Sequence, residues 1–392
     1  MNPSNPLVAE KRNTSCPLVF LINVDWYFLL HWRERALSAR DNGWDVWVIT
    51  CITDAKFRVE MESLGFNVVD VPISRHSINP LVELKVFRAV ARALQSVNPA
   101  ILHSVTIKPI CYSLLINKVS RFPVVLSFPG LGILRSESKV SRCVWWFLRT
   151  LLGKKYVNTS VSATFENHDD RSFTQDKGLL FSHSEVVPGA GVNLQRYPLL
   201  DQKKEGVEVR VLFASRLLRS KGIAKLVNAV GQLVEEGYPI RLVVAGIADY
   251  SHSDGLQESE LKIIRSKFYV DWLGQVDDML PVFEDCDVVC LPTSYGEGIP
   301  RVLIEGAACG RPLVATDVPG CRDIINQGKN GFIVPVEDQH SLVDALKILV
   351  VDSKLRNDFG IAGRAYVESN FSDQVVVSQV LSLYQRIIMK SI

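Results

Sequence analysis

Short apolar runs alternate with helical stretches along almost the whole chain, beginning at Leu18. Strands of four to eight residues that alternate with helices predict a parallel sheet covered by helices on both faces. Helices are expected over stretches such as His31–Asp41, Pro80–Val97 and Lys139–Leu152. The runs expected to form strands are Leu18–Asn23, Val46–Thr50, Asn67–Val71, Ala100–His103, Val124–Ser127, Val157–Ser160, Glu185–Val187, Val209–Ala214, Arg241–Ala245, Val270–Leu273, Val288–Leu291, Leu313–Thr316 and Gly331–Val334.

The length of the chain and one polar stretch predict two such domains. A chain of 392 residues is too long for one ordinary hydrophobic core. The segment Arg196–Val207 is polar, and a second series of strands and helices starts directly after it, which indicates a linker. We therefore expect an α/β protein with doubly wound parallel-sheet domains over residues 17–198 and 199–373, preceded by a disordered tail over residues 1–16.

The composition excludes several classes of protein. With 47% apolar and 22% charged residues the chain is typical of a globular protein. Its eight cysteines form no C-x-x-C pair, so no zinc site is expected, and buried thiols suit a reducing cytoplasm. No apolar run reaches the roughly 18 residues of a spanning helix, and no secretory signal is expected. The net charge of +2, without a recognition motif, argues against nucleic acid as a partner.

The stretch from Cys290 to Asp323 carries two carboxylates near one helix. Glu297 lies in the loop after an expected strand, Pro300 suits the first turn of a helix, and Glu305 lies inside that helix. A helix N-terminus presents free N–H groups and partial positive charge, which favours an anionic or polar ligand there. Eight helical residues span about 12 Å, so the two carboxylates are not expected to flank a single bond.

A basic loop follows the expected strand Val209–Ala214. It contains Arg216, Arg219, Lys221 and a glycine before the next helix. Such cations at a strand end form a candidate diphosphate site, because charge-assisted hydrogen bonds to phosphate are strong. On charge alone, a solvated basic loop is the better explanation of the pattern. Two or three of these cations could take part in such a site.

The segment EGIPRVLIEGAACGRPLVATDVPGCRD, which holds the pair Glu297 and Glu305, resembles the E-x7-E signature of retaining glycosyltransferases of family 4. The resemblance is close to the capsule and O-antigen branch of that family. It implies the GT-B fold, in which two Rossmann-like domains face each other across a cleft and a final helix, here 374–392, returns to the first domain. It also implies a metal-independent enzyme without a cofactor, whose nucleotide-sugar is a co-substrate.

The resemblance implies roles for individual residues of the second domain. Arg216 and Lys221 correspond to the cations that hold the donor diphosphate, and Glu297 to the carboxylate that holds the hydroxyls of the transferred sugar. These three are the expected catalytic residues, in a front-face substitution where the leaving phosphate accepts the acceptor's proton. Glu305 is expected on the ribose. The full set of expected donor-binding residues is Arg216, Lys221, Glu297, Gly298, Ile299, Pro300, Leu303 and Glu305.

Motifs in the first domain are less specific. The segment from His103 to Pro109 resembles an H-T-H-T-x-K-P pattern of the family, but Val105 replaces the second histidine. That replacement puts a contact to the donor sugar in doubt, and a lone histidine at a strand end is more often a core residue. The segment Phe165–Arg171 resembles an F-x-N-x-D-D-R pattern whose role can be structural. The acceptor-side candidates are Asp25, Trp26, His31, His103, Thr106, Lys108, Gly130 and Gly132.

Basic and aromatic residues are interleaved between Lys108 and Lys155. This interval holds nine Lys/Arg and one acid, Glu137, and includes two adjacent tryptophans. The pattern suits a membrane interface, and a crossover helix packed on its sheet is the competing interpretation. With the family resemblance, it predicts a peripheral protein at the inner face of the cytoplasmic membrane.

The predicted function is transfer of a sugar from a UDP-linked donor to a polyprenyl-diphosphate-linked or oligosaccharide acceptor in O-antigen, capsule or related polysaccharide assembly. Two alternatives remain open from the sequence: a nucleotide-sugar epimerase on the same fold, and a non-catalytic sugar-nucleotide-binding protein. An epimerase would consume the donor without an acceptor, and a binding protein would show no turnover.

Overall fold

The structure, a computed structural model, describes residues 16–74, 79–136, 138–152, 161–201, 208–250 and 252–391. Two sequence predictions lie outside these residues: the disordered tail, apart from Cys16, and the strand Val157–Ser160. The chain divides into two compact units. Unit 1 comprises the described residues of Met1–Ser127, Asn158–Ala163 and Leu381–Ile392, and unit 2 those of Phe128–Val157 and Thr164–Val380.

A seven-stranded sheet has the order β3-β2-β1-β4-β5-β6-β7. The pairs β1–β2, β1–β4, β2–β3 and β4–β5 are all parallel, as the alternation of strands and helices predicts. The strand order reverses between β1 and β4, which is the switch point of a doubly wound sheet. The strands are β1 (Pro17–Leu21), β2 (Asp45–Thr50), β3 (Asn67–Asp70), β4 (Ile101–Val105), β5 (Val124–Phe128), β6 (Val161–Phe165) and β7 (His183–Val186).

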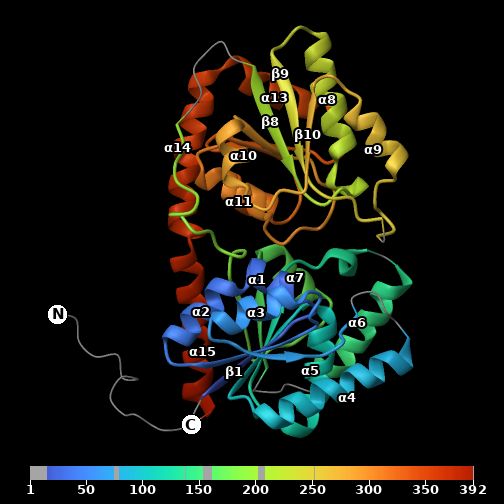
Figure 1. Ribbon diagram of the computed structural model, residues 1–392, viewed down its shortest axis with the longest axis vertical. Coiled ribbons are helices and arrows are strands. Elements are labelled where there is room, and N and C mark those ends of the chain that lie inside the picture. Colours follow the sequence, from blue (N-terminus) through green and yellow to red (C-terminus); the bar gives the residue numbers. More distant parts are fainter. Residues whose placement is uncertain are drawn as a thin grey trace, which may run out of the picture. The chain divides into compact units, whose positions relative to one another are not determined.

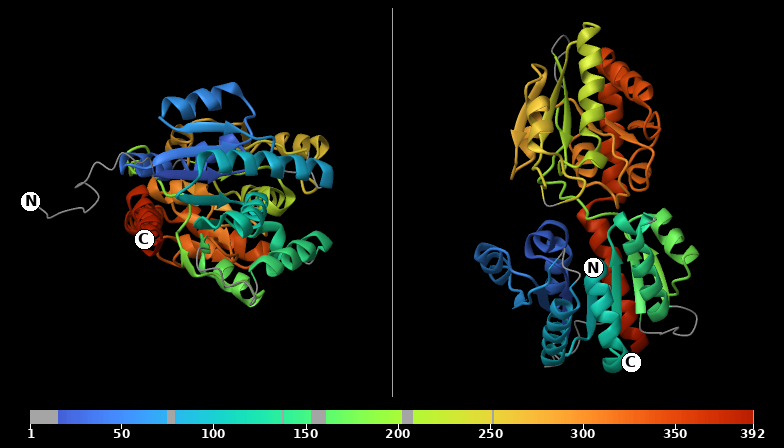
Figure 2. Two further views of the ribbon diagram at one scale, coloured as in Figure 1. Left: turned by 90° about the horizontal axis from the view of Figure 1, so that it is seen from below. Right: turned by 90° about the vertical axis from the view of Figure 1, so that its right-hand side faces the viewer.

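A six-stranded parallel sheet in unit 2 has the order β10-β9-β8-β11-β12-β13, with its switch point between β8 and β11. Both sheets carry helices on either side (Figures 1 and 2). The strands of the second sheet are β8 (Val209–Ala214), β9 (Ile240–Ala245), β10 (Val270–Gly274), β11 (Val288–Leu291), β12 (Leu313–Thr316) and β13 (Gly331–Val334).

Helices connect the strands and cover the sheets. Those before the polar linker are α1 (Asp25–His31), α2 (Arg33–Asp41), α3 (Ala55–Ser63), α4 (Pro80–Val97), α5 (Ile107–Ser120), α6 (Lys139–Leu152) and α7 (His168–Asp176), with a 3-10 turn η1 (Gly132–Arg135). Those after it are α8 (Ile223–Glu235), α9 (Glu258–Arg265), α10 (Leu280–Asp285), α11 (Arg301–Ala308), α12 (Cys321–Ile324), α13 (Gln339–Val351), α14 (Ser353–Asn370) and α15 (Asp373–Ser391), with a 3-10 turn η2 (Arg219–Lys221).

Helix α4 shows how local sequence sets an element. The side chain of Asn79 accepts a hydrogen bond from the Leu81 N–H, and Pro80 occupies the first helical position, where its missing N–H costs nothing. Asn98 ends the helix in the left-handed conformation, which asparagine tolerates better than most residues. The predicted bounds of this helix are therefore confirmed.

The first helix of the chain begins earlier than predicted. The sequence places a helix over His31–Asp41, whereas α1 already starts at Asp25 and α2 follows it. The residue before α1 is Val24, whose side chain makes no capping hydrogen bond, so the usual N-cap signal is missing. Strand β6 was also missed, because the prediction placed a strand over the four preceding residues.

Candidate functional site

Two loops meet at the carboxyl edge of the sheet in unit 2, one after β8 and one after β11. These strands are neighbours at the switch point, where ligands of doubly wound sheets bind. The Ser294 N–H donates to the Ser220 carbonyl at 2.7 Å, which joins the loops. Gly222 has φ +83°, and a Cβ there would lie 2.0 Å from the Pro292 carbonyl oxygen. Only glycine permits this approach of the two loops.

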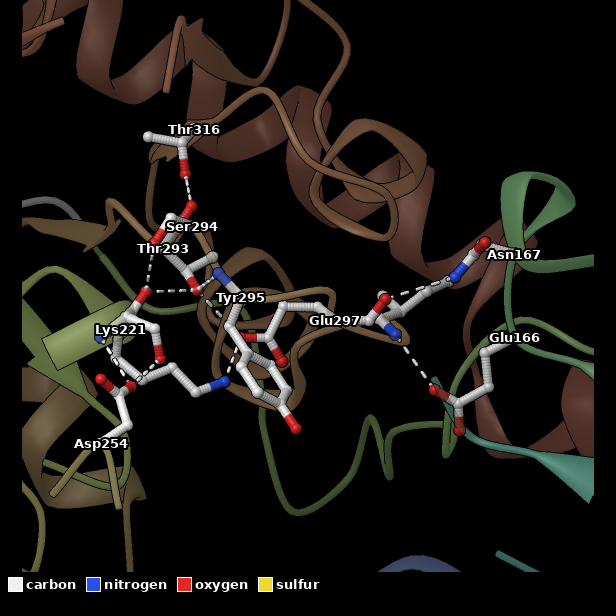
Figure 3. A network of polar contacts seen from close by, with 11 residues as sticks. Glu166, Asn167, Lys221, Asp254, Thr293, Ser294, Tyr295, Glu297 and Thr316 are labelled. Atoms are coloured by element: carbon white, nitrogen blue, oxygen red, sulfur yellow. Dashed lines mark hydrogen bonds and ion pairs between the residues drawn. The ribbon is translucent and has the colours of Figure 1, made fainter. Parts of the chain in front are cut away.

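Lys221 and Glu297 form an ion pair at this junction (Figure 3). Their side chains are only 8% and 13% exposed. The Thr293 hydroxyl donates to the same Glu297 carboxylate oxygen at 3.3 Å, and the Lys221 ammonium lies 4.8 Å from the centre of the Tyr295 ring. Two predicted site residues that are 76 positions apart in the sequence are thus in direct contact.

The other two cations of the basic loop have different partners. An Nη atom of Arg216 lies 3.5 Å from the carboxylate of Asp249, in the segment that follows β9. Arg219 pairs with Glu260 at 2.5 Å and donates to the Gly255 carbonyl at 2.9 Å. The structure therefore brings Lys221 to Glu297, while Arg216 and Arg219 contact carboxylates of the β9–α9 segment.

Glu305 is buried within α11, at 6% exposure. Its carboxylate accepts from the Arg301 side chain at 2.8 Å, one helical turn earlier. It also contacts Tyr197, whose pKa is raised first by burial and then by the Glu305 charge. Leu303 lies in the core of unit 2, and Pro300 is the N-cap of α11. An anionic or polar ligand at this helix would meet the backbone that precedes Arg301.

The backbone of the Glu297 loop contacts residues that sequence reasoning did not select. The Ile299 N–H donates to Glu166 Oε2 at 3.0 Å, and Asn167 Nδ2 lies 3.4 Å from the Glu297 carbonyl (Figure 3). Gly130, at φ +99°, packs against the Glu297 loop, and a Cβ built at Gly130 would lie 2.7 Å from the Gly298 nitrogen. The F-x-N-x-D-D-R resemblance was the available signal for Glu166 and Asn167, although it did not indicate this contact.

Gly132 also lies against the Glu297 loop. A Cβ built at Gly132 would lie 2.6 Å from the Tyr295 hydroxyl, and the residue has φ +44°. Both glycines of the first-domain G-x-G motif therefore pack on the segment that carries Glu297, within unit 2. Their predicted role on the acceptor side stays a prediction.

Two acceptor-side candidates of unit 1, His103 and Asp25, are completely buried. His103 is fully buried, with Nδ1 2.5 Å from the Tyr384 hydroxyl and Nε2 2.6 Å from the Ser127 hydroxyl. Burial, with a smaller contribution from the Arg35 charge, lowers the pKa of His103 to about 3, so the ring is neutral at pH 7. This is the core-histidine alternative that the sequence left open.

Asp25 is likewise buried, and its carboxylate accepts three hydrogen bonds, from the Trp26 N–H at 2.7 Å and from the Thr53 N–H and hydroxyl at 2.6 and 2.8 Å. The carboxylate thus ties the start of α1 to the loop after β2. Trp26 and His31 are on the same helix, and the ring of His31 lies 4.3 Å from that of Tyr27.

Thr106 and Lys108 lie at the start of α5. Thr106 is the N-cap of that helix with φ +72° and ψ 164°, a backbone region that β-branched residues rarely adopt. Lys108 pairs with Glu83 at 2.8 Å and donates to the Ser74 carbonyl at 2.7 Å.

Neither a metal centre nor a membrane span emerges from the described residues. They contain no group of three or more His, Cys, Asp or Glu side chains arranged to hold a metal ion. None of the described helices combines the length and the apolarity that crossing a membrane requires.

Chemically, the junction in unit 2 offers a cation and a carboxylate that already touch, beside a helix N-terminus. A cation of this kind binds phosphate oxygens, and a carboxylate accepts hydrogen bonds from hydroxyl groups. A ligand that carries both groups can break the ion pair, because its phosphate then binds Lys221 and its hydroxyl groups then bind Glu297. Nucleotide-sugars have this combination.

Two family descriptions match the sequence. "Glycosyl transferase 4-like" covers residues 18–158, and "Glycosyl transferases group 1" covers residues 201–366. Together they account for most of both α/β halves of the chain.

Curated relatives include glycosyltransferases of bacterial surface polysaccharides. The N,N'-diacetylbacillosaminyl-diphospho-undecaprenol alpha-1,3-N-acetylgalactosaminyltransferase of Campylobacter jejuni is 25% identical over 92% of this chain and 96% of its own length. The capsular polysaccharide biosynthesis glycosyltransferase CapM of Staphylococcus aureus is 27% identical over 51% of this chain and 54% of its own length.

Solved structures share the fold. HepE of Anabaena, in complex with UDP and glucose, has a TM-score of 0.76 at 18% identity and covers 95% of this chain and 100% of its own. Sucrose-phosphate synthase of Thermosynechococcus elongatus has a TM-score of 0.78 at 17% identity, and the match covers 95% of this chain and 99% of the synthase chain. The two parallel sheets, the residues gathered at Glu297 and these similarities agree: the chain belongs to the GT-B glycosyltransferases of family 4.

Proposed function

We propose that this glycosyltransferase moves a sugar from a UDP-linked donor to a polyprenyl-diphosphate-linked or oligosaccharide acceptor, in the assembly of O-antigen, capsule or a related polysaccharide. The observation that carries the proposal is the contact of Lys221 with Glu297 at the switch point of the second sheet. The Campylobacter relative, by its name, acts on a diphospho-undecaprenol-linked sugar, and HepE was solved with UDP. Both support this choice of acceptor and donor.

Lys221 and Glu297 divide the donor between them in this proposal. The Lys221 ammonium leaves the carboxylate and binds the diphosphate, where negative charge grows as the nucleotide departs. Glu297 then accepts hydrogen bonds from hydroxyls of the transferred sugar. Arg216 and Lys221 supply the positive charge for the leaving group in a metal-independent reaction, with Arg216 released from Asp249.

The reaction proceeds with retention of configuration. The bond between the anomeric carbon and the phosphate oxygen breaks while the acceptor oxygen bonds to the same face of that carbon. The acceptor's proton passes to the departing phosphate oxygen, so the step needs no protein base. The chain contributes positioning and electrostatic stabilisation.

The test is a transfer assay with radiolabelled UDP-sugars and a synthetic polyprenyl-diphosphate-linked sugar, with and without EDTA. Labelled lipid product whose new linkage keeps the donor's anomeric configuration by NMR, formed also in EDTA, is the expected result. Consumption of UDP-sugar without acceptor would indicate the epimerase instead. Absence of turnover with every donor and acceptor would favour a binding protein.

We also propose that α6 contacts an anionic lipid surface, which would bring the enzyme to its acceptor. The exposed residues of this helix include three cations and a tryptophan that is 63% exposed, while the neighbouring Trp145 is buried and donates to the Leu134 carbonyl. Basic and aromatic residues on one exposed face suit the headgroup region. The exposed residues are Lys139, Val140, Arg142, Cys143, Trp146, Arg149 and Thr150.

Two other cations of the predicted patch are held in ion pairs. Lys108 pairs with Glu83, and Arg135 pairs with the buried Asp170 at 2.7 Å. Lys154 and Lys155 lie outside the described residues. The membrane proposal therefore depends on α6.

Replacing Arg142 and Arg149 together by Glu should weaken binding to phosphatidylglycerol vesicles at least about 30-fold, because each basic residue near an anionic surface contributes about 1 kcal/mol. Vesicle sedimentation measures this effect. The control is Lys329→Glu with Lys354→Glu, which changes the net charge equally at two exposed lysines elsewhere in unit 2. If both double variants lose vesicle binding equally, the loss comes from net charge and α6 is not the membrane contact.

A further inference from the structure

The backbone around Glu297 is held from one side by the junction of β6 and α7, within unit 2 (Figure 3). Glu166 Oε2 accepts the Ile299 N–H at 3.0 Å, and Asn167 Nδ2 donates to the Glu297 carbonyl at 3.4 Å. These contacts lie on both sides of Gly298. They hold the short segment between the Glu297 side chain and the N-terminus of α11.

The junction itself is rigidly built. Asn167 is fully buried and caps α7: it accepts the Asp170 N–H at 2.7 Å and donates to the Asp170 carboxylate at 3.1 Å. Asp170 is also fully buried and pairs with Arg135 at 2.7 Å. Buried polar side chains that hydrogen-bond to each other, as Asn167 and Asp170 do, favour one conformation. Glu166 therefore belongs to a segment that is held in one conformation.

Gly298 allows the Glu166 carboxylate to lie directly on the loop. A Cβ at this position would be 2.0 Å from Glu166 Oε2, so any other residue would displace that carboxylate. The glycine and the carboxylate fit each other, and the hydrogen bond to Ile299 depends on both. A substitution at Glu166 and a substitution at Gly298 should therefore break the same hydrogen bond.

We propose that Glu166 is a positioning residue for recognition of the donor sugar. It fixes the Ile299 N–H, and through that N–H the orientation of the loop that carries Glu297. The inference rests on the proposed function, because it assigns Glu297 to the sugar hydroxyls. Glu166 itself needs no contact with the donor, and it acts on the sugar part of the ligand rather than on the nucleotide.

The contribution of the sugar can be measured separately from that of the nucleotide. Titration calorimetry is carried out with UDP and with UDP-glucose, UDP-galactose and their N-acetylated forms. It yields one dissociation constant for UDP and one for the UDP-sugar that binds most tightly. We call Kd(UDP)/Kd(UDP-sugar) the sugar ratio. The variants are Glu166→Ala, the conservative Glu166→Gln, and Gly298→Ala. Thermal melting of each variant checks that it folds.

Glu166→Ala is expected to lower the sugar ratio about tenfold, because it removes the hydrogen bond between the Ile299 N–H and a charged carboxylate. Kd(UDP) is expected to stay unchanged, because that bond lies beside the site proposed for the sugar and not beside the nucleotide. Glu166→Gln keeps an amide oxygen that can accept the Ile299 N–H, so most of the ratio returns. Gly298→Ala is expected to match Glu166→Ala, and the double variant to lose nothing further. In a Glu297→Ala background, Glu166→Ala is expected to have no effect.

The matched control is Asp169→Ala. Asp169 follows closely on the same junction and pairs with Arg322 at 2.7 Å, but both side chains are exposed, at 48% and 44%. This variant should keep the wild-type sugar ratio. If it lowers the ratio as far as Glu166→Ala does, the effect belongs to the junction as a whole and the proposal is wrong.

Other results distinguish the inference from the function on which it rests. An unchanged sugar ratio in Glu166→Ala, or equal weakening of UDP and UDP-sugar, overturns the positioning role while the donor assignment stands. A wild-type protein that binds neither UDP nor any UDP-sugar overturns the proposed function, and the inference with it.

Discussion

Polar residues in or after the strands have opposite roles in the two units. In unit 2, Lys221 and Glu297 are ionisable partners at a loop junction that are largely buried and pair with each other. In unit 1, His103 and Asp25 are completely buried, and each is held by neutral groups of the fold. An ion pair at a loop junction can exchange its partners for those of a ligand. A buried side chain whose hydrogen bonds are all internal instead stabilises one structure.

The difference shows why similar motif evidence has unequal value. Both regions were selected because polar residues lie at or after the end of an expected strand, at the carboxyl edge of a parallel sheet. Position alone does not distinguish a ligand-binding group from a structural one. The partners of each group distinguish them, and four experiments test that distinction, beginning with the largest expected effect.

Glu297→Ala should lower turnover roughly 10²–10³-fold, by analogy with removal of one positioned transition-state partner. Initial rates at saturating donor and acceptor measure it. The control is Glu236→Ala, which removes the carboxylate of another Lys–Glu pair of unit 2, at 3.0 Å from Lys347. Near-normal turnover in Glu297→Ala would end its assignment to the donor.

Lys221→Met should weaken UDP binding by about 10–100-fold, because a charge-assisted contact to the diphosphate is lost. The same change should leave the sugar ratio much closer to its wild-type value than Glu297→Ala does. Calorimetric titration with UDP and UDP-sugar separates the two effects. If Lys221→Met lowers the sugar ratio and spares UDP, the proposed division of the donor is reversed.

His103→Gln tests the buried region through pH. The pKa of His103 is about 3 in the folded protein and 6.5 in the unfolded chain, so the unfolded state binds more protons between these values. Stability from this group is complete above pH 6.5 and is lost as the pH falls toward 3. Between pH 7 and pH 5 the wild type should lose about 2 kcal/mol more than His103→Gln in urea unfolding. Equal losses would mean that His103 titrates normally.

Asp25→Asn should have the smallest effect. Its neutral amide can replace only part of the three hydrogen bonds that the carboxylate accepts, so stability should fall by about 1 kcal/mol. Turnover at saturating substrates should change less than about threefold, measured under conditions where the variant is folded. A large loss of turnover without a loss of stability would return Asp25 to the acceptor site and weaken the contrast between the units.

Much of the fold follows from local sequence. The bounds of α4, α6, β8, β11, β12 and β13 agree with the prediction, because apolar runs, Pro80 at a first helical turn and Asn98 at a helix end are local signals. The start of α1 was missed since Val24 provides no capping side chain, and β6 was displaced by four residues. Boundaries without a capping or turn residue have no local signal to locate them.

For the candidate site, the sequence alone determined the family resemblance, the alternation that builds parallel sheets and the presence of Arg216, Lys221 and Glu297 in loops after strands, with Glu305 in the helix that follows. Only the tertiary structure decided which of them meet. Lys221 reaches Glu297, Arg216 reaches Asp249, and Glu305 turns back to Arg301 within its own helix. It also brought Glu166 onto the Glu297 loop. Secondary structure depends on neighbours in the sequence, whereas the partner of a charged side chain depends on residues that only the packing of distant segments brings close.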